Sequence, residues 1–180
     1  IYWTADDRLV VSRAELEPLK ARPVTQGELY TTDVKAKNQD VLFGFVPDTV
    51  SKRGKRKDHG WSVVAKVLDR EPGMALVDFT CWDCGEEPDT VIFKVDTRTG
   101  ARKEIERGDK LASYGFDQTG EPRLRTTWDD NDDPVLHYRR AKGGDWIPLP
   151  KSIAGRTLYG ARFADDNNTV YALVTDQLEP

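Results

Sequence analysis

One stretch of the chain comes close to the turn that carries a nucleophilic serine. Gly60-Trp61-Ser62-Val63-Val64 supplies the first glycine and the serine of a Gly-x-Ser-x-Gly elbow, and His137 lies downstream. Val64 stands where the elbow needs its second glycine, and a β-branched residue does not allow the close approach of that turn. Residues 63–68 also have the composition of a β-strand. We therefore interpret Ser62 as a residue at the entry to a strand, and we assign no catalytic residue in this chain.

Two cysteines form a second candidate, the CxxC pair in Cys81-Trp82-Asp83-Cys84. A redox-active pair needs a thiol whose pKa is lowered at a helix N-terminus, whereas this pair follows a predicted strand and has acidic neighbours. A zinc site needs two further ligands, and neither His59 nor His137 has the spacing of a metal-binding motif. The pattern favours a hairpin loop with two thiols or a local disulfide over a zinc or redox role, and we expect no cofactor or metal.

Two runs of like-charged residues could indicate an ion site or a nucleic-acid surface, but neither run has the other residues that such a site requires. Lys52-Arg53-Gly54-Lys55-Arg56-Lys57 has only Trp61 nearby, whereas nucleic-acid surfaces interleave basic and aromatic side chains. Asp129-Asp130-Asn131-Asp132-Asp133 begins like a calcium loop, but Pro134 and Arg140 occupy the positions that require Gly and Glu. We interpret the first run as a solvated loop, with contact to a ligand carboxylate or to a partner domain as the alternative. The second run predicts a turn between strands, with a weak surface cation site as the alternative.

The composition is that of a folded and strongly charged chain. Its 180 residues include 27 basic and 31 acidic side chains, which gives a net charge of −4, and 38% of the residues are hydrophobic. No run of about 18 apolar residues marks a transmembrane helix, and Ile1-Tyr2-Trp3-Thr4 has neither region of a signal peptide. The acidic balance argues against nucleic acid as a partner. Since no Met precedes Ile1, we expect a processed product or a piece of a longer chain, from the cytoplasm or the periplasm.

Short β-strands dominate the predicted secondary structure. The one helical candidate, Ala14–Lys20, is interrupted by Pro18. Runs rich in β-branched and aromatic residues predict strands over Arg8–Ser12, Leu29–Val34, Val41–Val46, Ser62–Leu68, Ala75–Thr80, Val91–Val95, Lys103–Glu106, Leu111–Phe116, Arg123–Thr127, Val135–Arg139, Trp146–Leu149, Leu158–Phe163 and Val170–Val174. Evenly spaced short strands are typical of an all-β sandwich, barrel or propeller.

A repeat in the sequence helps to distinguish among these three folds. Leu68, Phe116 and Phe163 each end a strand before a tight turn, at intervals of 48 and 47 residues, and a second strand follows each turn. Four strands in such a period make one propeller blade, which must bury both faces against neighbours. We predict an all-β chain of about three four-stranded blades, cut in mid-blade at both ends, with an open sandwich of repeated meanders as the alternative.

The repeat also gives the expected divisions and anchors. The divisions are blade remnants over 1–50, blades over 61–107 and 109–150, and a partial blade over 158–180. The anchors are the strand-ending and turn residues Leu68, Phe116, Asp117, Gly120, Phe163 and Asp165. We expect the tryptophans to pack between blades rather than to stack on a ligand; these are Trp3, Trp61, Trp82, Trp128 and Trp146.

Four strand-and-turn motifs follow one another between about Asp89 and Asp176. They are Val91-Ile92-Phe93-Lys94-Val95-Asp96-Thr97-Arg98-Thr99-Gly100, Tyr114-Gly115-Phe116-Asp117-Gln118-Thr119-Gly120-Glu121-Pro122-Arg123, His137-Tyr138-Arg139-Arg140 before Trp146, and Phe163-Ala164-Asp165-Asp166 before Thr169-Val170-Tyr171. In this order they resemble the N-terminal β-propeller of the prolyl oligopeptidase family of serine peptidases, in particular its bacterial dipeptidyl and acylaminoacyl peptidase-like members.

The resemblance implies a function for the chain. Family members carry a ring of about seven blades that caps an α/β-hydrolase domain and admits only small peptides. The chain is then a non-catalytic propeller segment, with the catalytic triad beyond Pro180 and with the hydrolase domain and peptide substrates as partners. Some dipeptidyl members hold the substrate amino terminus with two glutamates on a short helix, but Glu86-Glu87 has no helical signal.

A binding module is the alternative function. It is a stand-alone β-repeat domain that binds protein or carbohydrate through its loops. On either interpretation, blades that end the array expose unpaired strand edges and apolar faces, which recruit other chains. We therefore expect self-association, and neither nucleic acid nor a membrane as a partner.

Overall fold

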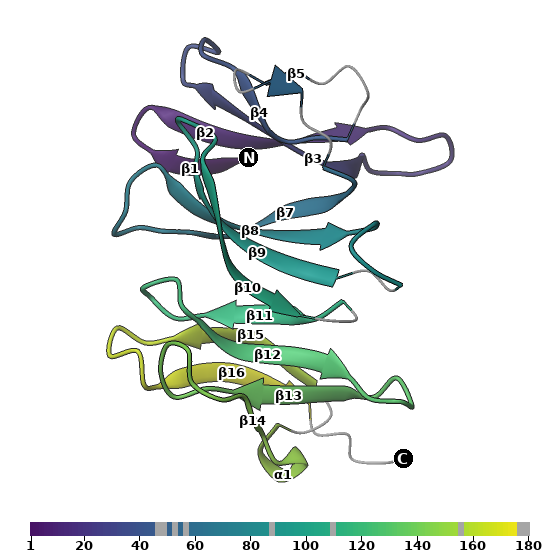
Figure 1. Ribbon diagram of the computed structural model, residues 1–180, viewed down its shortest axis with the longest axis vertical. Coiled ribbons are helices and arrows are strands. Elements are labelled where there is room, and N and C mark those ends of the chain that lie inside the picture. Colours follow the sequence, from purple (N-terminus) through teal and green to yellow (C-terminus); the bar gives the residue numbers. More distant parts are fainter. Residues whose placement is uncertain are drawn as a thin grey trace. The chain divides into compact units, whose positions relative to one another are not determined.

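Antiparallel meanders form most of the regular backbone in the computed structural model of the chain (Figure 1). The structure describes residues 1–45, 50–51, 54–55, 58–86, 89–108, 111–154 and 157–175. The chain divides into two compact units, Ile1–Gly108 and Asp109–Pro180. In the described residues both units are all-β, apart from one helical turn in the second unit. No helix in this part of the chain is long and apolar enough to cross a membrane.

The first unit holds two four-stranded sheets in which each strand pairs with the next along the chain. The first sheet consists of β1 (Tyr2–Ala5), β2 (Arg8–Glu15), β3 (Val24–Asp33) and β4 (Asp40–Phe43). The second consists of β7 (Gly60–Val67), β8 (Met74–Cys81), β9 (Asp89–Asp96) and β10 (Arg102–Gly108). Between them in sequence, β5 (Val50–Ser51) and β6 (Gly54–Lys55) form a two-stranded hairpin.

The core of the first unit lies between its two sheets, where β3 contacts β7. Alternate residues of β8, from Ala75 to Cys81, are buried in this core, as the two-residue period of a strand requires. The ring of Phe43 from β4 lies 5.6 Å from that of Phe79 and 5.8 Å from that of Phe93. Burial of an apolar side chain of this size contributes about 1.5–3 kcal/mol. The shared core therefore holds the two sheets face to face.

The second unit holds one four-stranded meander and one hairpin. The meander consists of β11 (Ser113–Phe116), β12 (Pro122–Trp128), β13 (Pro134–Tyr138) and β14 (Ile147–Pro148); α1 (Lys151–Ala154) follows, and then the hairpin of β15 (Thr157–Phe163) and β16 (Val170–Thr175). β11 contacts β15. The backbone N–H of Gln118 donates to Asn167 Oδ1 at 2.8 Å, and the Arg123 guanidinium lies 5.5 Å from the Phe163 ring centre. These contacts join the meander to the hairpin.

The thirteen predicted strands are confirmed, since each overlaps a strand of the structure. The interrupted helical candidate Ala14–Lys20 forms no helix: Ala14 and Glu15 continue β2 and pair with β3, and Pro18 and a positive φ at Leu19 then turn the chain. Residues 1–50 contain a full four-stranded sheet rather than remnants, because β1 adds a strand at its edge. Val46, at the end of one predicted strand, lies outside the described residues.

Candidate functional site

A cleft of about 770 Å³ opens in the first unit where three chain segments meet. The segments are residues 3–7 in β1 and its following turn, residues 67–72 at the β7–β8 turn, and Arg98 in the β9–β10 turn. β1 contacts β7, so that the turns which follow these two strands come together. The cleft therefore combines residues that lie more than ninety positions apart in the sequence.

A buried hydrogen-bond network joins the three segments that line the cleft. The carbonyl of Thr4 accepts from the Gly73 N–H at 2.6 Å, and the Gly73 carbonyl accepts from the N–H and the hydroxyl of Thr97, both at 2.8 Å. The Thr4 and Thr97 hydroxyl oxygens lie 2.9 Å apart, and both side chains are almost completely buried. Gly73 has a φ of 89°, a conformation that favours glycine. Because buried polar groups are costly to leave unpaired, this network fixes the three segments relative to one another.

Aromatic and charged side chains form the walls. Trp3 is 61% exposed. The Arg98 guanidinium donates to both carboxylate oxygens of Asp7, at 2.9 Å and 2.5 Å, and this pairing holds the pKa of Asp7 below its ordinary value. Asp6 and Asp69 also line the cleft, and no hydrogen bond or ion pair joins their carboxylates to another described side chain. The cleft thus brings together an exposed tryptophan and two carboxylates that have no partner among the described side chains.

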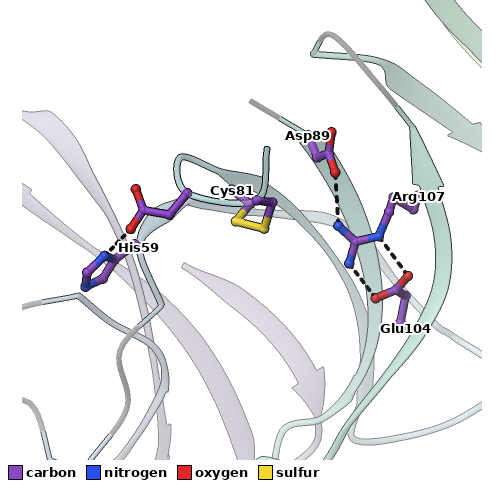
Figure 2. Close-up of a disulfide and its surroundings, with 7 residues drawn as sticks. His59, Cys81, Asp89, Glu104 and Arg107 are labelled. Carbon is purple, nitrogen blue, oxygen red and sulfur yellow. Dashed lines mark hydrogen bonds and ion pairs between the residues drawn. A yellow bond between two sulfur atoms is a disulfide. The ribbon is translucent and has the colours of Figure 1, made fainter. Parts of the chain in front are cut away.

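A disulfide joins Cys81 and Cys84 at the end of β8 (Figure 2). Of the two expectations for this loop, the local disulfide is confirmed. The backbone N–H of Trp82 donates to the His59 carbonyl at 2.9 Å, and His59 Nδ1 contacts the Asp83 carboxylate. The loop is thereby tied to the segment that leads into β7. A small hollow of about 260 Å³ beside the disulfide is lined by Asp58, His59, Phe79, Cys81 and Asp83.

An exposed ion-pair cluster lies beside the disulfide on β9 and β10. Figure 2 shows the Arg107 guanidinium between the carboxylates of Asp89 and Glu104. Arg107 Nη1 is 3.2 Å from Asp89 Oδ2, and Nη2 is 2.8 Å from Glu104 Oε2. Exposed pairs of this kind contribute about 0–1 kcal/mol each. The cluster therefore contributes little to holding β10 on β9.

Ser62 occupies a buried position in β7, as the sequence indicated. Its hydroxyl donates to the Gly27 carbonyl of β3 at 2.6 Å, which links the two sheets of the first unit. His137 lies on β13 in the second unit, where burial and then the neighbouring Arg125 guanidinium lower its pKa. Ser62 is thus engaged in a structural hydrogen bond rather than exposed on an elbow.

The acidic run at Asp129–Asp133 forms the turn between β12 and β13, and this prediction is confirmed. Asp129 Oδ1 accepts from the N–H groups of Asn131 and Asp133 at 2.9 Å and 3.0 Å. Across the described part of the chain, no group of three or more His, Cys, Asp or Glu side chains is placed to hold a metal ion.

Two other charged runs lie largely outside the described residues. In the basic run over residues 52–57, only the backbone of Gly54 and Lys55, which form β6, is described. Glu86 follows the disulfide loop in irregular backbone, and Glu87 lies outside the described residues.

Most repeat anchors lie where a strand enters a turn. Leu68, Asp117 and Phe163 are buried, Phe116 is partly buried, and Gly120 has a φ of 84°. Asp165 is exposed, and its neighbour Asp166 accepts the turn hydrogen bonds, from the N–H groups of Asn168 and Thr169, both at 2.9 Å. Asp166 was not among the predicted anchors, although its role in the turn could have been predicted, because it begins an Asp-x-x-Thr run, as Asp96 does.

The tryptophans divide into two groups. Trp61 packs between sheets as expected, against Gly27, where a Cβ atom would lie 2.8 Å from the indole. Trp146 contacts the guanidinium groups of Arg125 and Arg139, at 4.9 Å and 4.4 Å from its ring centre. The remaining three are substantially exposed, so that the expectation of burial between blades was wrong for them; they are Trp3, Trp82 and Trp128.

Comparisons with known proteins identify no relative of this chain. No family model, no curated protein and no solved structure matches it. The resemblance to the prolyl oligopeptidase family therefore rests on the sequence motifs alone.

Proposed function

We propose that the chain is a non-catalytic propeller segment of a prolyl oligopeptidase family serine peptidase, which gates small peptides to an α/β-hydrolase active site outside this chain. The observation that carries the proposal is a contact that recurs from sheet to sheet. In the first unit, the β7–β8 turn donates from Gly73 to Thr4 of the preceding sheet. In the second, the β11–β12 turn donates from Gln118 to Asn167 of the β15–β16 hairpin. Four-stranded meanders that share such contacts are typical of stacked propeller blades.

The proposed role of a gate is supported by the architecture of the sheets and by the use of the elbow-like serine. In a stack of antiparallel sheets the turns lie at two rims. In this chain the one serine in an elbow-like sequence, Ser62, is used to join two sheets. The proposed partners are the hydrolase domain of the parent protein and its peptide substrates.

The test begins with the coding sequence downstream of Pro180 and continues with hydrolysis assays. We expect further blade repeats, then Gly-x-Ser-x-Gly, Asp and His. The whole protein should cleave short peptides and spare folded proteins, while the purified 180-residue chain should cleave neither. Hydrolysis by the 180-residue chain that Ser62→Ala abolishes would contradict the proposal. So would a coding sequence that holds no hydrolase domain.

A stand-alone binding module is the second candidate, and the cleft in the first unit favours it. An exposed tryptophan in a cleft with carboxylates that have no described partner is a ligand-binding arrangement that needs no hydrolase domain. The coding sequence downstream of Pro180 also distinguishes the two candidates, because a stand-alone module is encoded without a Gly-x-Ser-x-Gly elbow. The ligand of such a module can then be sought with the purified chain alone.

A further inference from the structure

We propose that the cleft of the first unit binds the positively charged group of a ligand, an ammonium or a guanidinium, between the Trp3 indole and the carboxylates of Asp6 and Asp69. The inference concerns the first unit alone and does not depend on the proposed peptidase function. The cleft was not predicted from the sequence, and the proposal assigns it a class of ligand.

The dimensions and the lining of the cleft are those of a binding site. Its volume of about 770 Å³ falls within the range of roughly 300–1,000 Å³ that small-molecule sites occupy. Ala5, Val67, Leu68 and Pro72 line it beside the charged residues. Because the Thr4, Gly73 and Thr97 network joins the three segments that carry the lining residues, these segments keep their spacing before any ligand arrives. Preorganisation of this kind lowers the entropic cost of binding.

The charge of the cleft selects a cation. Three carboxylates line it, those of Asp6, Asp7 and Asp69, against one guanidinium, that of Arg98. Arg98 is engaged with both oxygens of Asp7, so these two charges offset each other. Two negative charges remain without a described partner. An anionic ligand is repelled by them, and a neutral ligand gains hydrogen bonds at most, without the attraction between opposite charges.

The indole of Trp3 distinguishes an organic cation from a metal ion. Trp3 is 61% exposed and lines the cleft, so its indole is accessible to a ligand there. Indole is the aromatic ring that binds ammonium and guanidinium groups most strongly through its face. A metal ion instead needs several oxygen, nitrogen or sulfur ligands at short range, and the described residues provide no such group of three. An aromatic face with two carboxylates therefore matches an organic cation.

The experiment titrates the 180-residue chain, labelled with ¹⁵N at its tryptophans, with butylguanidinium and butylammonium. Butylurea serves as the neutral isostere and butyrate as the anion. We expect a saturable shift of the Trp3 indole N–H signal, identified from its loss in Trp3→Phe, with both cations only. Added salt should weaken the binding, because it screens the carboxylates.

Variants of exposed residues localise the binding without disturbing the fold. Asp6→Asn and Asp69→Asn should each weaken binding about fivefold, and Trp3→Ala about tenfold, as calorimetry can measure. Trp128→Ala and Asp130→Asn, exposed residues of the second unit, should leave it unchanged. Equal urea midpoints verify that the variants fold.

Two results would overturn the inference. One is a Trp3 shift that butylurea produces as well as the cations do, which makes the cleft a site for neutral ligands. The other is the absence of any saturable response in the folded chain. Neither result bears on the peptidase proposal, which is tested by the coding sequence and by hydrolysis.

Discussion

Single aspartates fix the turns of this protein through local hydrogen bonds. Asp33, Asp96, Asp117, Asp129 and Asp166 each accept from backbone N–H groups two to four positions later. Burial opposes ionisation at several of them, but these bonds favour the charged carboxylate and lower the pKa of all five. The short polar side chain replaces the backbone partners that a turn lacks.

Asp117 gives the first prediction, because it is the buried member of this set. Its carboxylate accepts from the Thr119 N–H and hydroxyl, from the Glu121 N–H and from Arg123. Asp117→Ala leaves these donors unpaired and should lower the free energy of unfolding by about 2–4 kcal/mol at neutral pH. Urea denaturation measures this loss, and Asp165→Ala, at an exposed neighbouring turn, is the control and should change stability by less than about 0.5 kcal/mol.

The pH dependence of the Asp117 effect follows from the sign of its pKa shift. Burial raises this pKa, but the hydrogen bonds and Arg123 outweigh burial, so the native value lies below the ordinary 3.8. The carboxylate therefore stabilises the protein fully above pH 4 and loses this contribution as the pH falls through the native pKa. The difference between wild type and Asp117→Ala should shrink in acid. A difference that stays constant would contradict the role of the charge.

For Asp78 the pKa shift, and therefore the pH dependence of stability, has the opposite sign. It lies in the middle of β8, and burial raises its pKa from 3.8 to about 6. The native state then binds a proton more tightly than the unfolded state, so stability falls as the pH rises from about 4 to about 6. Asp78→Asn removes the ionisation and should increase the free energy of unfolding at pH 7 by about 1–3 kcal/mol.

Denaturation curves at two pH values test this prediction. The Asp78→Asn gain should be present at pH 7 and nearly absent at pH 4, where wild-type Asp78 already carries a proton. Asp130→Asn, at an exposed turn, should give no gain at either pH. A gain of equal size at both pH values would mean that Asp78 acts through packing and not through its charge.

At the scale of elements, Arg102 joins the outer strands of the two sheets in the first unit. It starts β10, and its guanidinium lies 3.6 Å from the Phe43 ring centre of β4. The same group pairs with both oxygens of Asp58, at 2.7 Å and 2.8 Å, and donates to the Leu42 carbonyl. Both members of the ion pair are largely buried. The Arg102 side chain thus stacks on Phe43, pairs with Asp58 and donates a hydrogen bond to the Leu42 carbonyl.

Replacement of Arg102 should weaken the contact between these strands. Arg102→Lys keeps the charge but loses the planar fork and the stacking, and should lower the free energy of unfolding by about 2–4 kcal/mol. Hydrogen exchange should accelerate in β4 and β10 before it does in β8. Arg107→Lys on the same strand is the matched control, and because its ion pairs are exposed it should cost less than about 1 kcal/mol. Equal costs for the two variants would contradict the proposed contact.

The strands could be predicted from the sequence because their signal is local. Alternation along β8 and the turn residues after each strand are visible within ten positions. The cleft could not be predicted in the same way, because Thr4 and Thr97 meet only through the stacking of two sheets. The exposure of Trp3 is also a property of this stacking, and its residue type alone favoured burial. The disulfide was one of two open alternatives, since the spacing of the cysteines permits both thiols and a bond.

At the scale of the whole molecule, β16 exposes several large apolar side chains. Tyr171 is 68% exposed and Leu173 is 73% exposed. β16 pairs with β15 alone in the described sheets, whereas the three large sheets each reach four strands. An unpaired apolar edge can add a strand from a second molecule, because its N–H and C=O groups lack partners. We therefore expect the 180-residue chain to self-associate through β16.

Leu173→Lys tests this expectation, because a lysine on an edge strand opposes pairing with a second edge. Sedimentation velocity of the wild-type chain should show dimers that increase with concentration, and Leu173→Lys should shift the distribution to monomers. Leu19→Lys is the control: Leu19 is fully exposed but lies in a turn, so its replacement should leave the dimers unchanged. A wild-type chain that stays monomeric at high concentration would show that the β16 edge does not recruit a second copy. Dimers that persist in Leu173→Lys would place the contact elsewhere on the surface.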